Sequence, residues 1–276
     1  MSRETAMIDD GNVAHSAFTT YSYETDCFAE ARLAFYFQIV QEVAGMHAAQ
    51  RGCSIPAMHK EGKTWVITRS HMEVFRYTQW PEPITVETWA QQPIRLHLPR
   101  AVKGYDGQGN PLFVAKTHWA ILDLDTARPC RPLDMSLRIG LPPLEDEAHH
   151  LDMNLPKRSV LETGELTHVS AYKPSIAYLD TDRNHHVNNI SYLNWALESL
   201  PPEFRNRYKV VVADLSFQRQ TFLGDDLTVH TFSLDPNALE AKNPQLEHQI
   251  IRTEADGGTT VVWEGSTKWN PREDLR

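Results

Sequence analysis

The sequence has few cysteines, no long apolar run and no excess of positive charge. Its three cysteines, Cys27, Cys53 and Cys130, form no Cys-x-x-Cys pair. They therefore predict neither a disulfide framework nor a zinc site, and they favour a reducing, cytoplasmic compartment. No apolar run approaches the roughly 18 residues that a membrane-spanning helix needs. The first ten residues lack a basic stretch followed by an apolar block, so we expect no signal peptide.

The charge and composition of the chain exclude further classes of protein. A formal net charge of −9 offers no global positive field, which argues against nucleic acid as the main partner. The 276 residues are 41% hydrophobic and 23% charged, as in an ordinary globular protein. A chain of this length buries enough surface to fold without disulfides or metals, as one large domain or two small ones.

An internal repeat divides the chain into two halves. Asp26, Tyr36 and Glu42 match Asp182, Tyr192 and Glu198, each at an offset of 156 (182 − 26). Further matches pair residues 84–89 with 227–232, at an offset of 143, and residues 117–119 with 267–269, at an offset of 150. The order of the matches is constant and the offset drifts, as loop insertions would cause, so we infer a duplicated unit.

Each half shows one helical pattern followed by strand patterns. Apolar residues recur at helical spacing near residues 33–44, before Gly52, and near residues 190–200, before Pro201 and Pro202. β-Branched and aromatic runs predict strands at 65–68, 84–89, 210–212 and 227–232, and Asp-Gly turns at 106–107 and 256–258 predict hairpins. We therefore predict an α+β fold with two units, 13–135 and 165–270, in which a curved antiparallel sheet wraps one long helix. A linker is expected at 136–164, where prolines and acidic residues interrupt the periodicity.

Polar residues crowd positions 180–189, directly before the second helix. This segment holds two Asp, three Asn and two His. Helix caps explain one or two of these residues, but not all seven. Free N–H groups at a helix start can hold an oxyanion, and a histidine can accept a proton from water at neutral pH. A nearby carboxylate can orient the histidine. These are the groups needed to hydrolyse an activated acyl group.

The segment also resembles the signature of a known family. The pattern Asp182-x-Asn184-x-His186-Val187-Asn188-Asn189-x-x-Tyr192-x-x-Trp195-x-x-Glu198 is similar to that of plant and bacterial acyl-acyl-carrier-protein thioesterases. Residues 65–69, 80–81, 86–89 and 119–124 resemble N-terminal blocks of that family in the same order. The resemblance spans about residues 15–270. His-Val-Asn-Asn also occurs in single-unit acyl-CoA thioesterases, so the tandem arrangement is the specific part.

The resemblance implies a double hot-dog fold. Its C-terminal unit would be catalytic, and its N-terminal unit would shape the acyl pocket without chemistry of its own. The implied reaction is hydrolysis of fatty acyl-acyl carrier protein in fatty acid biosynthesis, with the carrier as partner and with no cofactor and no metal. The chain would be a monomer with an internal pseudo-dimer, or a homodimer. The acyl chain length is not predicted.

Asp182, Asn184 and His186 match the catalytic residues of the family. His186 is expected to act as general base or to orient water. Asp182 would orient that system or attack directly, and the sequence leaves both open. Asn184 would position the water or the substrate carbonyl, and backbone N–H groups near Asn188 and Asn189 would stabilise the oxyanion.

A further family site is expected on the strand after the helix. Gln220 stands where the family has Glu, and Thr221 where the plant enzymes have Cys. A cysteine nucleophile is therefore not available at this position, and Gln220 can bind water but cannot act as a base. The first half has Glu30 and Arg32 where the second has His186 and Asn188, so no chemistry is expected there.

Two other functions stay open at this point, an acyl-CoA thioesterase and a non-catalytic acyl-binding protein. A basic cluster after the second helix, Arg205, Arg207 and Lys209, is either a solvated loop or a docking patch for the acidic carrier.

Overall fold

The computed structural model describes residues 7–155 and 166–275. The chain divides into two compact units, Met1–Leu155 (unit 1) and Pro156–Arg276 (unit 2). The division falls within the segment 136–164 that we expected to be a linker. Residues 156–164 of that segment lie outside the described part of the chain.

Unit 1 consists of an antiparallel sheet, one long helix and two short helices. Its strands follow one another in the sheet in the order β1, β2, β4, β5, β6, β3. Their bounds are β1 Met7–Ile8, β2 Ala14–Thr19, β3 Lys63–Val74, β4 Pro83–Ala90, β5 His97–Tyr105 and β6 Pro111–Asp123. The helices are α1 Leu33–Gln50, α2 Ile55–Lys60 and α3 Leu133–Ile139.

Unit 2 repeats this arrangement. Its strands are ordered β8, β11, β10, β9, β7 and are antiparallel. Their bounds are β7 Thr167–Tyr172, β8 Tyr208–Phe217, β9 Asp226–Ser233, β10 Gln245–Thr253 and β11 Thr259–Pro271. The helices are α4 Asn189–Glu198 and α5 Pro202–Arg207. Short 3-10 turns lie at Ser22–Glu24, Glu147–His149, Tyr178–Asp180, Ala238–Glu240 and Arg272–Leu275.

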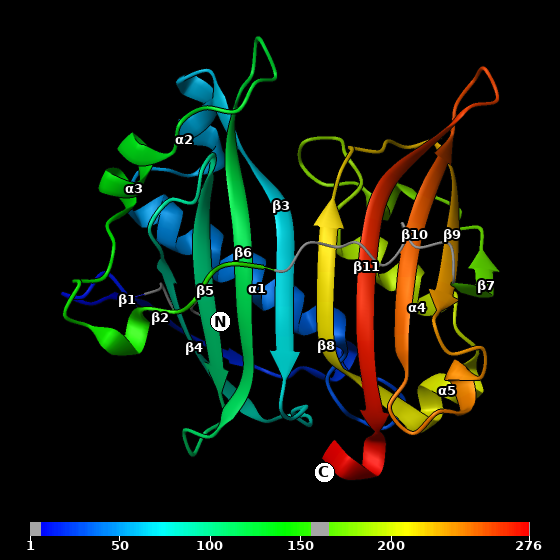
Figure 1. Cartoon of the computed structure of the whole chain (residues 1–276). Helices are drawn as coiled ribbons and strands as arrows, with labels where there is room; N and C mark the ends of the chain where they lie inside the picture. The colour runs from blue at the N-terminus through cyan, green and yellow to red at the C-terminus, as the bar shows by residue number, and fades with distance from the viewer. Residues whose placement is uncertain (1–6, 156–165, 276) are drawn as a thin grey trace. The chain divides into compact units, whose positions relative to one another are not determined.

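In each unit the long helix packs against one face of its sheet. Figure 1 shows α1 crossing the sheet of unit 1 and α4 crossing the sheet of unit 2. Tyr36 of α1 and Trp89 of β4 are fully buried in unit 1, and Leu193 of α4 and Trp263 of β11 are fully buried in unit 2. Burial of these large apolar side chains holds each helix to its sheet. The predicted α+β arrangement is confirmed for each unit. Among the described helices, none is both long and apolar enough to cross a bilayer.

Two details differ from the sequence-based expectations. Each half begins with a strand rather than with the helix: β2 precedes α1 and β7 precedes α4. These strands lack a clear apolar alternation, and β7 contains no fully buried residue. The helix α4 ends at Glu198, before the two prolines, and the expected loop after it begins with the short helix α5. Pro202 opens α5 because proline is tolerated in the first turn of a helix.

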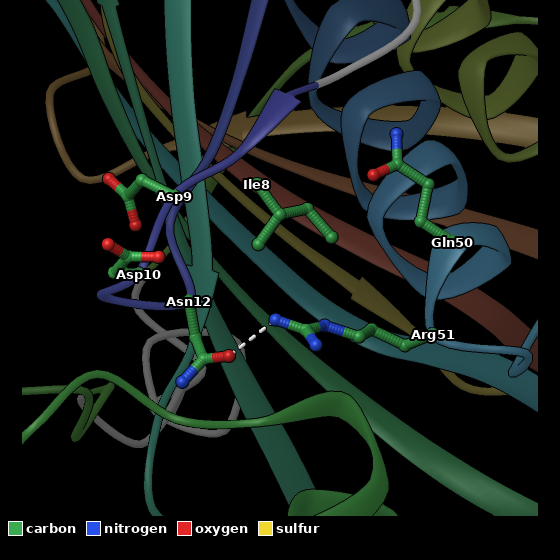
Figure 2. A pocket seen from close by; sticks show the side chains of 6 residues that line it. All are labelled: Ile8, Asp9, Asp10, Asn12, Gln50 and Arg51. Carbon is green, nitrogen blue, oxygen red and sulfur yellow. Dashed lines mark hydrogen bonds between the residues drawn. The ribbon is translucent and has the colours of Figure 1, made fainter.

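Unit 1 carries a polar surface depression. Figure 2 shows it lined by Ile8, Asp9, Asp10, Asn12, Gln50 and Arg51, with Arg51 donating a hydrogen bond to Asn12 Oδ1. Five of these six side chains are polar or charged. Pockets for apolar ligands are lined mainly by apolar side chains, so this depression does not fit an acyl chain.

Candidate active site

A tight turn at residues 182–186 carries the candidate catalytic residues. Asp182 Oδ1 accepts hydrogen bonds from the backbone N–H groups of Asn184, at 2.7 Å, and His186, at 3.4 Å. The Asp182 N–H donates to the carbonyl of His186 at 2.8 Å, and His185 adopts a positive φ of 61°. The turn thus places Asp182, Asn184 and His186 together, all half-buried, while His185 is exposed.

The imidazole of His186 is available for chemistry. Its ring packs edge-on against the ring of Phe222, with centroids 5.1 Å apart. Neither ring nitrogen has a hydrogen-bond partner in residues 7–155 and 166–275, and the carboxylate of Asp182 is bonded to the turn rather than to the imidazole. A half-buried imidazole with free nitrogens can accept a proton from a bound water.

The start of α4 supplies fewer free N–H groups than the sequence suggested. Asn188 is the N-cap, and its Oδ1 accepts from the Ile190 N–H at 2.9 Å. The Asn188 N–H itself donates to the carbonyl of Asp180 at 2.7 Å. The backbone N–H of Asn188 is therefore already occupied and is not free to donate to an oxyanion. The Asn189 N–H has no acceptor among the described residues, so it is the amide that remains for that role.

Gln220 and Thr221 lie in a loop rather than on a strand, because β8 ends at Phe217. Gln220 is exposed, whereas Thr221 is fully buried. The Thr221 carbonyl accepts from the Val187 N–H at 2.9 Å, and its Oγ1 lies 2.6 Å from the hydroxyl of Tyr192. The loop 218–225 is thereby joined to the turn that carries His186. The strand placement expected for Gln220 and Thr221 is wrong.

Unit 1 contains the same framework at the matching positions. Asp26 Oδ1 accepts from the N–H groups of Phe28, at 2.9 Å, and Glu30, at 3.2 Å, and Ala29 has a φ of 59°. The Ala31 N–H donates to the carbonyl of Thr78 at 2.8 Å. The framework is therefore shared, and the two units differ in the side chains that it carries.

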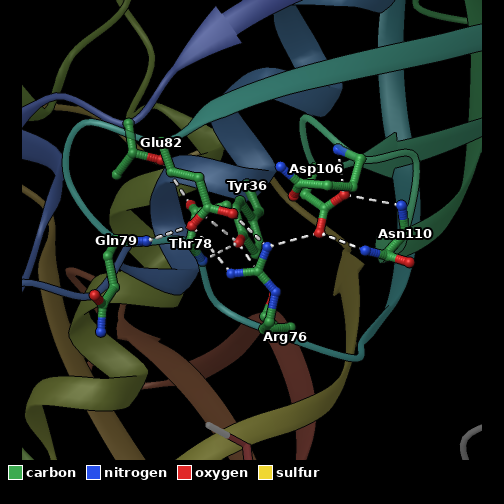
Figure 3. Close-up of polar contacts among 9 residues, drawn as sticks. Tyr36, Arg76, Thr78, Gln79, Glu82, Asp106 and Asn110 are labelled. Atoms are coloured by element: carbon green, nitrogen blue, oxygen red, sulfur yellow. Dashed lines mark hydrogen bonds and ion pairs between the residues drawn. The ribbon is translucent and has the colours of Figure 1, made fainter.

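Each unit also has a cluster of ion pairs beside this framework, but the arginines at the centre of the two clusters do not occupy matching positions. In unit 1, Arg76 pairs with Glu82 and with Asp106, at 3.1 Å in the second case (Figure 3). In unit 2, Arg252 of β10 pairs with Asp225, at 3.4 Å, and with Glu254, at 2.9 Å.

Arg219, the unit 2 counterpart of Arg76, does not take part in the ion-pair cluster of its unit. Arg219 matches Arg76 at an offset of 143 (219 − 76). The backbone N–H of Arg76 donates to the carbonyl of Leu112, and that of Arg219 donates to the carbonyl of Val262, each in the last strand of its unit. Arg219 is exposed and forms no ion pair with a described residue. Arg183, in the His186 turn, is also exposed without an ion pair in that part of the chain. Sequence reasoning missed both, although the internal repeat at the offset of 143 was the signal that could have found Arg219.

The structure does not form the expected basic cluster after α4. Lys209 is buried on β8, with 7% of its surface exposed. Arg205 pairs with Glu198 at 2.6 Å, and Arg207 pairs with Glu240 at 3.3 Å. These three residues therefore do not make one exposed, uncompensated basic patch.

Two tandem units, each with one helix wrapped by an antiparallel sheet and the second with a histidine-bearing turn before its helix, define the class of double hot-dog proteins. The matching family models are the acyl-ACP thioesterase N-terminal domain, over residues 11–137, and the acyl-ACP thioesterase C-terminal domain, over residues 164–271. The chain belongs to the acyl-acyl-carrier-protein thioesterase family. It is accordingly a thioester hydrolase, as the resemblance of its sequence implied.

Individual relatives agree with this assignment. The chain is 29% identical over 248 residues to an oleoyl-acyl carrier protein thioesterase of Arabidopsis thaliana, covering 86% of this chain and 67% of that protein. Among solved structures, an acyl-ACP thioesterase of Bacteroides thetaiotaomicron superposes with a TM-score of 0.75 at 21% identity, covering 94% of this chain and 98% of that one. The 12:0-ACP thioesterase of Umbellularia californica gives 0.75 at 20% identity, with 95% and 98% covered. The solved structures support the fold.

Proposed function

We propose that unit 2 hydrolyses the thioester of fatty acyl-acyl carrier protein with a water molecule activated by His186. The observation that carries this proposal is the half-buried imidazole with two free nitrogens, held in a turn before the start of α4. The water oxygen bonds to the acyl carbon while His186 takes the water proton. Collapse of the tetrahedral intermediate then breaks the C–S bond, and the proton held by His186 passes to the leaving sulfur, so that the fatty acid and the carrier thiol are released. A thiol pKa near about 8.5 makes the thiolate a good leaving group, so only modest acid assistance is needed.

The other residues of the turn support this step. Asn184 would position the water or the substrate carbonyl through its amide group. The Asn189 N–H, at the positive end of the α4 dipole, would donate to the developing oxyanion. We assign Asp182 to holding the turn, because both hydrogen bonds of its Oδ1 go to backbone N–H groups of that turn. Gln220 is exposed beside the site and would contact the water or the substrate without acting as a base.

Recognition of the acidic carrier requires positive charge near the site, since the chain itself has a net charge of −9. Arg205, Arg207 and Lys209 do not supply it, because two are paired with carboxylates and one is buried. We therefore assign carrier contact to Arg183 and Arg219, which are exposed in the two loops that form the site.

The test is release of free fatty acid from a panel of acyl-acyl-carrier-protein and acyl-CoA thioesters. We expect turnover of the carrier substrates and its loss in His186→Ala. A higher kcat/KM for acyl-CoA than for acyl-acyl carrier protein would identify acyl-CoA as the preferred substrate. Tight binding of acyl thioesters without any turnover would instead make the chain an acyl-binding protein.

A further inference from the structure

We propose that Tyr192 and Thr221 are positioning residues that hold the His186 turn in its productive place. The proposal rests on the catalytic role of His186 proposed above. Neither residue is expected to contact the reacting atoms.

A short chain of contacts connects α4 to the turn. The Tyr192 hydroxyl lies 2.6 Å from Thr221 Oγ1, and the Thr221 carbonyl accepts from the Val187 N–H at 2.9 Å. Val187 directly follows His186, so any displacement of the Thr221 backbone moves the peptide next to the catalytic imidazole. Phe222, the next residue of the loop, contacts the His186 ring itself. The position of His186 thus depends on where the Thr221 loop is fixed.

The Tyr192–Thr221 pair is well suited to fix this loop. Tyr192 is 3% exposed and Thr221 is fully buried, so water cannot replace a lost hydrogen bond between them. The Tyr192 ring also packs against Trp195, with centroids 5.8 Å apart, and stacks on Trp263 at 6.4 Å. The packing of the Tyr192 ring therefore fixes the position of its hydroxyl, because rotation of the ring would disturb the core.

Unit 1 contains the same pair without a histidine. The Tyr36 hydroxyl accepts from the Thr78 N–H at 2.8 Å and lies 3.3 Å from Thr78 Oγ1. Figure 3 shows the two residues beside each other. Both residues are fully buried, and the turn that they hold carries Glu30 where unit 2 has His186. The pair is therefore a scaffold of the unit, and in unit 2 the residue that it places is a catalytic one. It also provides a matched control within one chain.

Four variants of the full chain test the proposal: Tyr192→Phe and Thr221→Val in unit 2, and Tyr36→Phe and Thr78→Val in unit 1. We expect a loss of Tm in both units, because each variant removes a buried hydrogen bond: that between Tyr192 and Thr221 in unit 2, and in unit 1 that of Tyr36 with the Thr78 N–H or that of Thr78 Oγ1 with Thr20 Oγ1. Only the unit 2 variants should lower kcat, by about tenfold or more, since small misplacements of a catalytic group have large effects on rate. KM should change by less than about twofold, and Thr221→Ser should restore kcat because it keeps the hydroxyl.

Two further readouts separate this proposal from the proposed function. His186→Ala decides whether the histidine is catalytic at all, independently of the four variants. In Tyr192→Phe, the NMR resonances of the His186 ring should shift or broaden relative to those of the wild type, with or without substrate. Equal kcat losses in the unit 1 and unit 2 variants, or a Thr221→Ser variant as slow as Thr221→Val, would overturn the positioning role while leaving His186 as the base.

Discussion

Asp26 and Asp182 hold the same turn in the two units, 156 residues apart. Each accepts hydrogen bonds through Oδ1 from the N–H groups two and four residues later. Each turn also contains a residue with positive φ, Ala29 in unit 1 and His185 in unit 2. Because Asp26 does this where no histidine follows, the hydrogen bonds of Asp182 are explained by the geometry of the turn and require no chemical role.

This relationship predicts different outcomes for two substitutions of Asp182. Asp182→Ala removes the acceptor for two N–H groups, so both Tm and kcat should fall. Asp182→Asn keeps an Oδ1 acceptor, so it should retain the wild-type Tm and at least about a tenth of kcat. Removal of a catalytically required charge would lower kcat by more than this. Asp26→Ala is the matched control and should lower Tm alone. A wild-type Tm combined with a loss of kcat beyond about 100-fold in Asp182→Asn would assign a chemical role to the carboxylate.

Removal of the imidazole tests the general base. We expect His186→Ala to lower kcat by at least about 100-fold, the usual contribution of a general base, with little change in Tm because the ring is half-buried. The adjacent His185 is exposed and should tolerate alanine with nearly wild-type kcat. Steady-state kinetics and circular dichroism of both variants provide the comparison. Near-wild-type turnover of His186→Ala would disprove the proposed mechanism.

Much of the fold was predictable from the sequence because the duplication shows each element twice. The apolar spacing before Gly52 and the β-branched runs led to α1, β3, β4, β8 and β9. The strands β2 and β7 were missed because neither alternates between apolar and polar residues. The helix α5 was missed because Pro201 and Pro202 favoured a loop, whereas Pro202 is in fact its first residue.

The site was predictable only in part. The spacing of Asp182, Asn184 and His186 was recognisable in the sequence, whereas the use of their backbone groups depends on three-dimensional hydrogen bonds. The contact between Thr221 and Tyr192 spans 29 residues, and no local pattern reveals it. The basic cluster was misjudged because linear spacing does not show that Lys209 is buried or that Glu240 approaches Arg207.

Thiol reagents should not block the active site. Position 221 carries a hydroxyl, and all three cysteines belong to unit 1. Cys27 is exposed, whereas Cys53 is fully buried, and burial raises the pKa of its thiol, which makes it less reactive. We expect stoichiometric alkylation of Cys27 to leave kcat unchanged, as measured by mass spectrometry and fatty acid release on the same sample. Rapid inactivation that substrate prevents would contradict the water-based mechanism.

Charge reversal distinguishes the two sets of candidate docking residues. The double variant Arg183→Glu and Arg219→Glu should lower kcat/KM for acyl-carrier-protein substrates, with little change in kcat and a smaller effect on acyl-CoA. Raising the salt concentration from about 0.05 to about 0.5 M should weaken the wild type more than the variant, since exposed charges are screened within about 10 Å at about 0.1 M. Arg205→Glu is the control, because Arg205 is already paired with Glu198. A larger effect of Arg205→Glu would return docking to the segment after α4.

A buried histidine in unit 1 predicts how stability depends on pH. His47 of α1 is fully buried, and its Nδ1 accepts a hydrogen bond from Arg100 Nη1 at 2.9 Å. Burial, together with the positive charges of Arg100 and Arg51, lowers the pKa of His47 to about 3. The folded protein therefore keeps this imidazole neutral at every pH down to about 3, whereas the unfolded chain protonates it below about 6.5.

The unfolded state therefore binds one more proton than the folded state between about pH 6.5 and pH 3. Stability contributed by the neutral His47 is present above about pH 6.5 and decreases as the pH falls, by up to about 1.4 kcal/mol per pH unit. Urea unfolding at pH 7 and pH 5 measures the change, to which other groups also contribute. The His47→Gln variant isolates the share of this residue, and its free energy of unfolding should lose about 2 kcal/mol less than that of the wild type between the two pH values. An equal loss in both proteins would show that the pKa of His47 is not lowered in the folded protein.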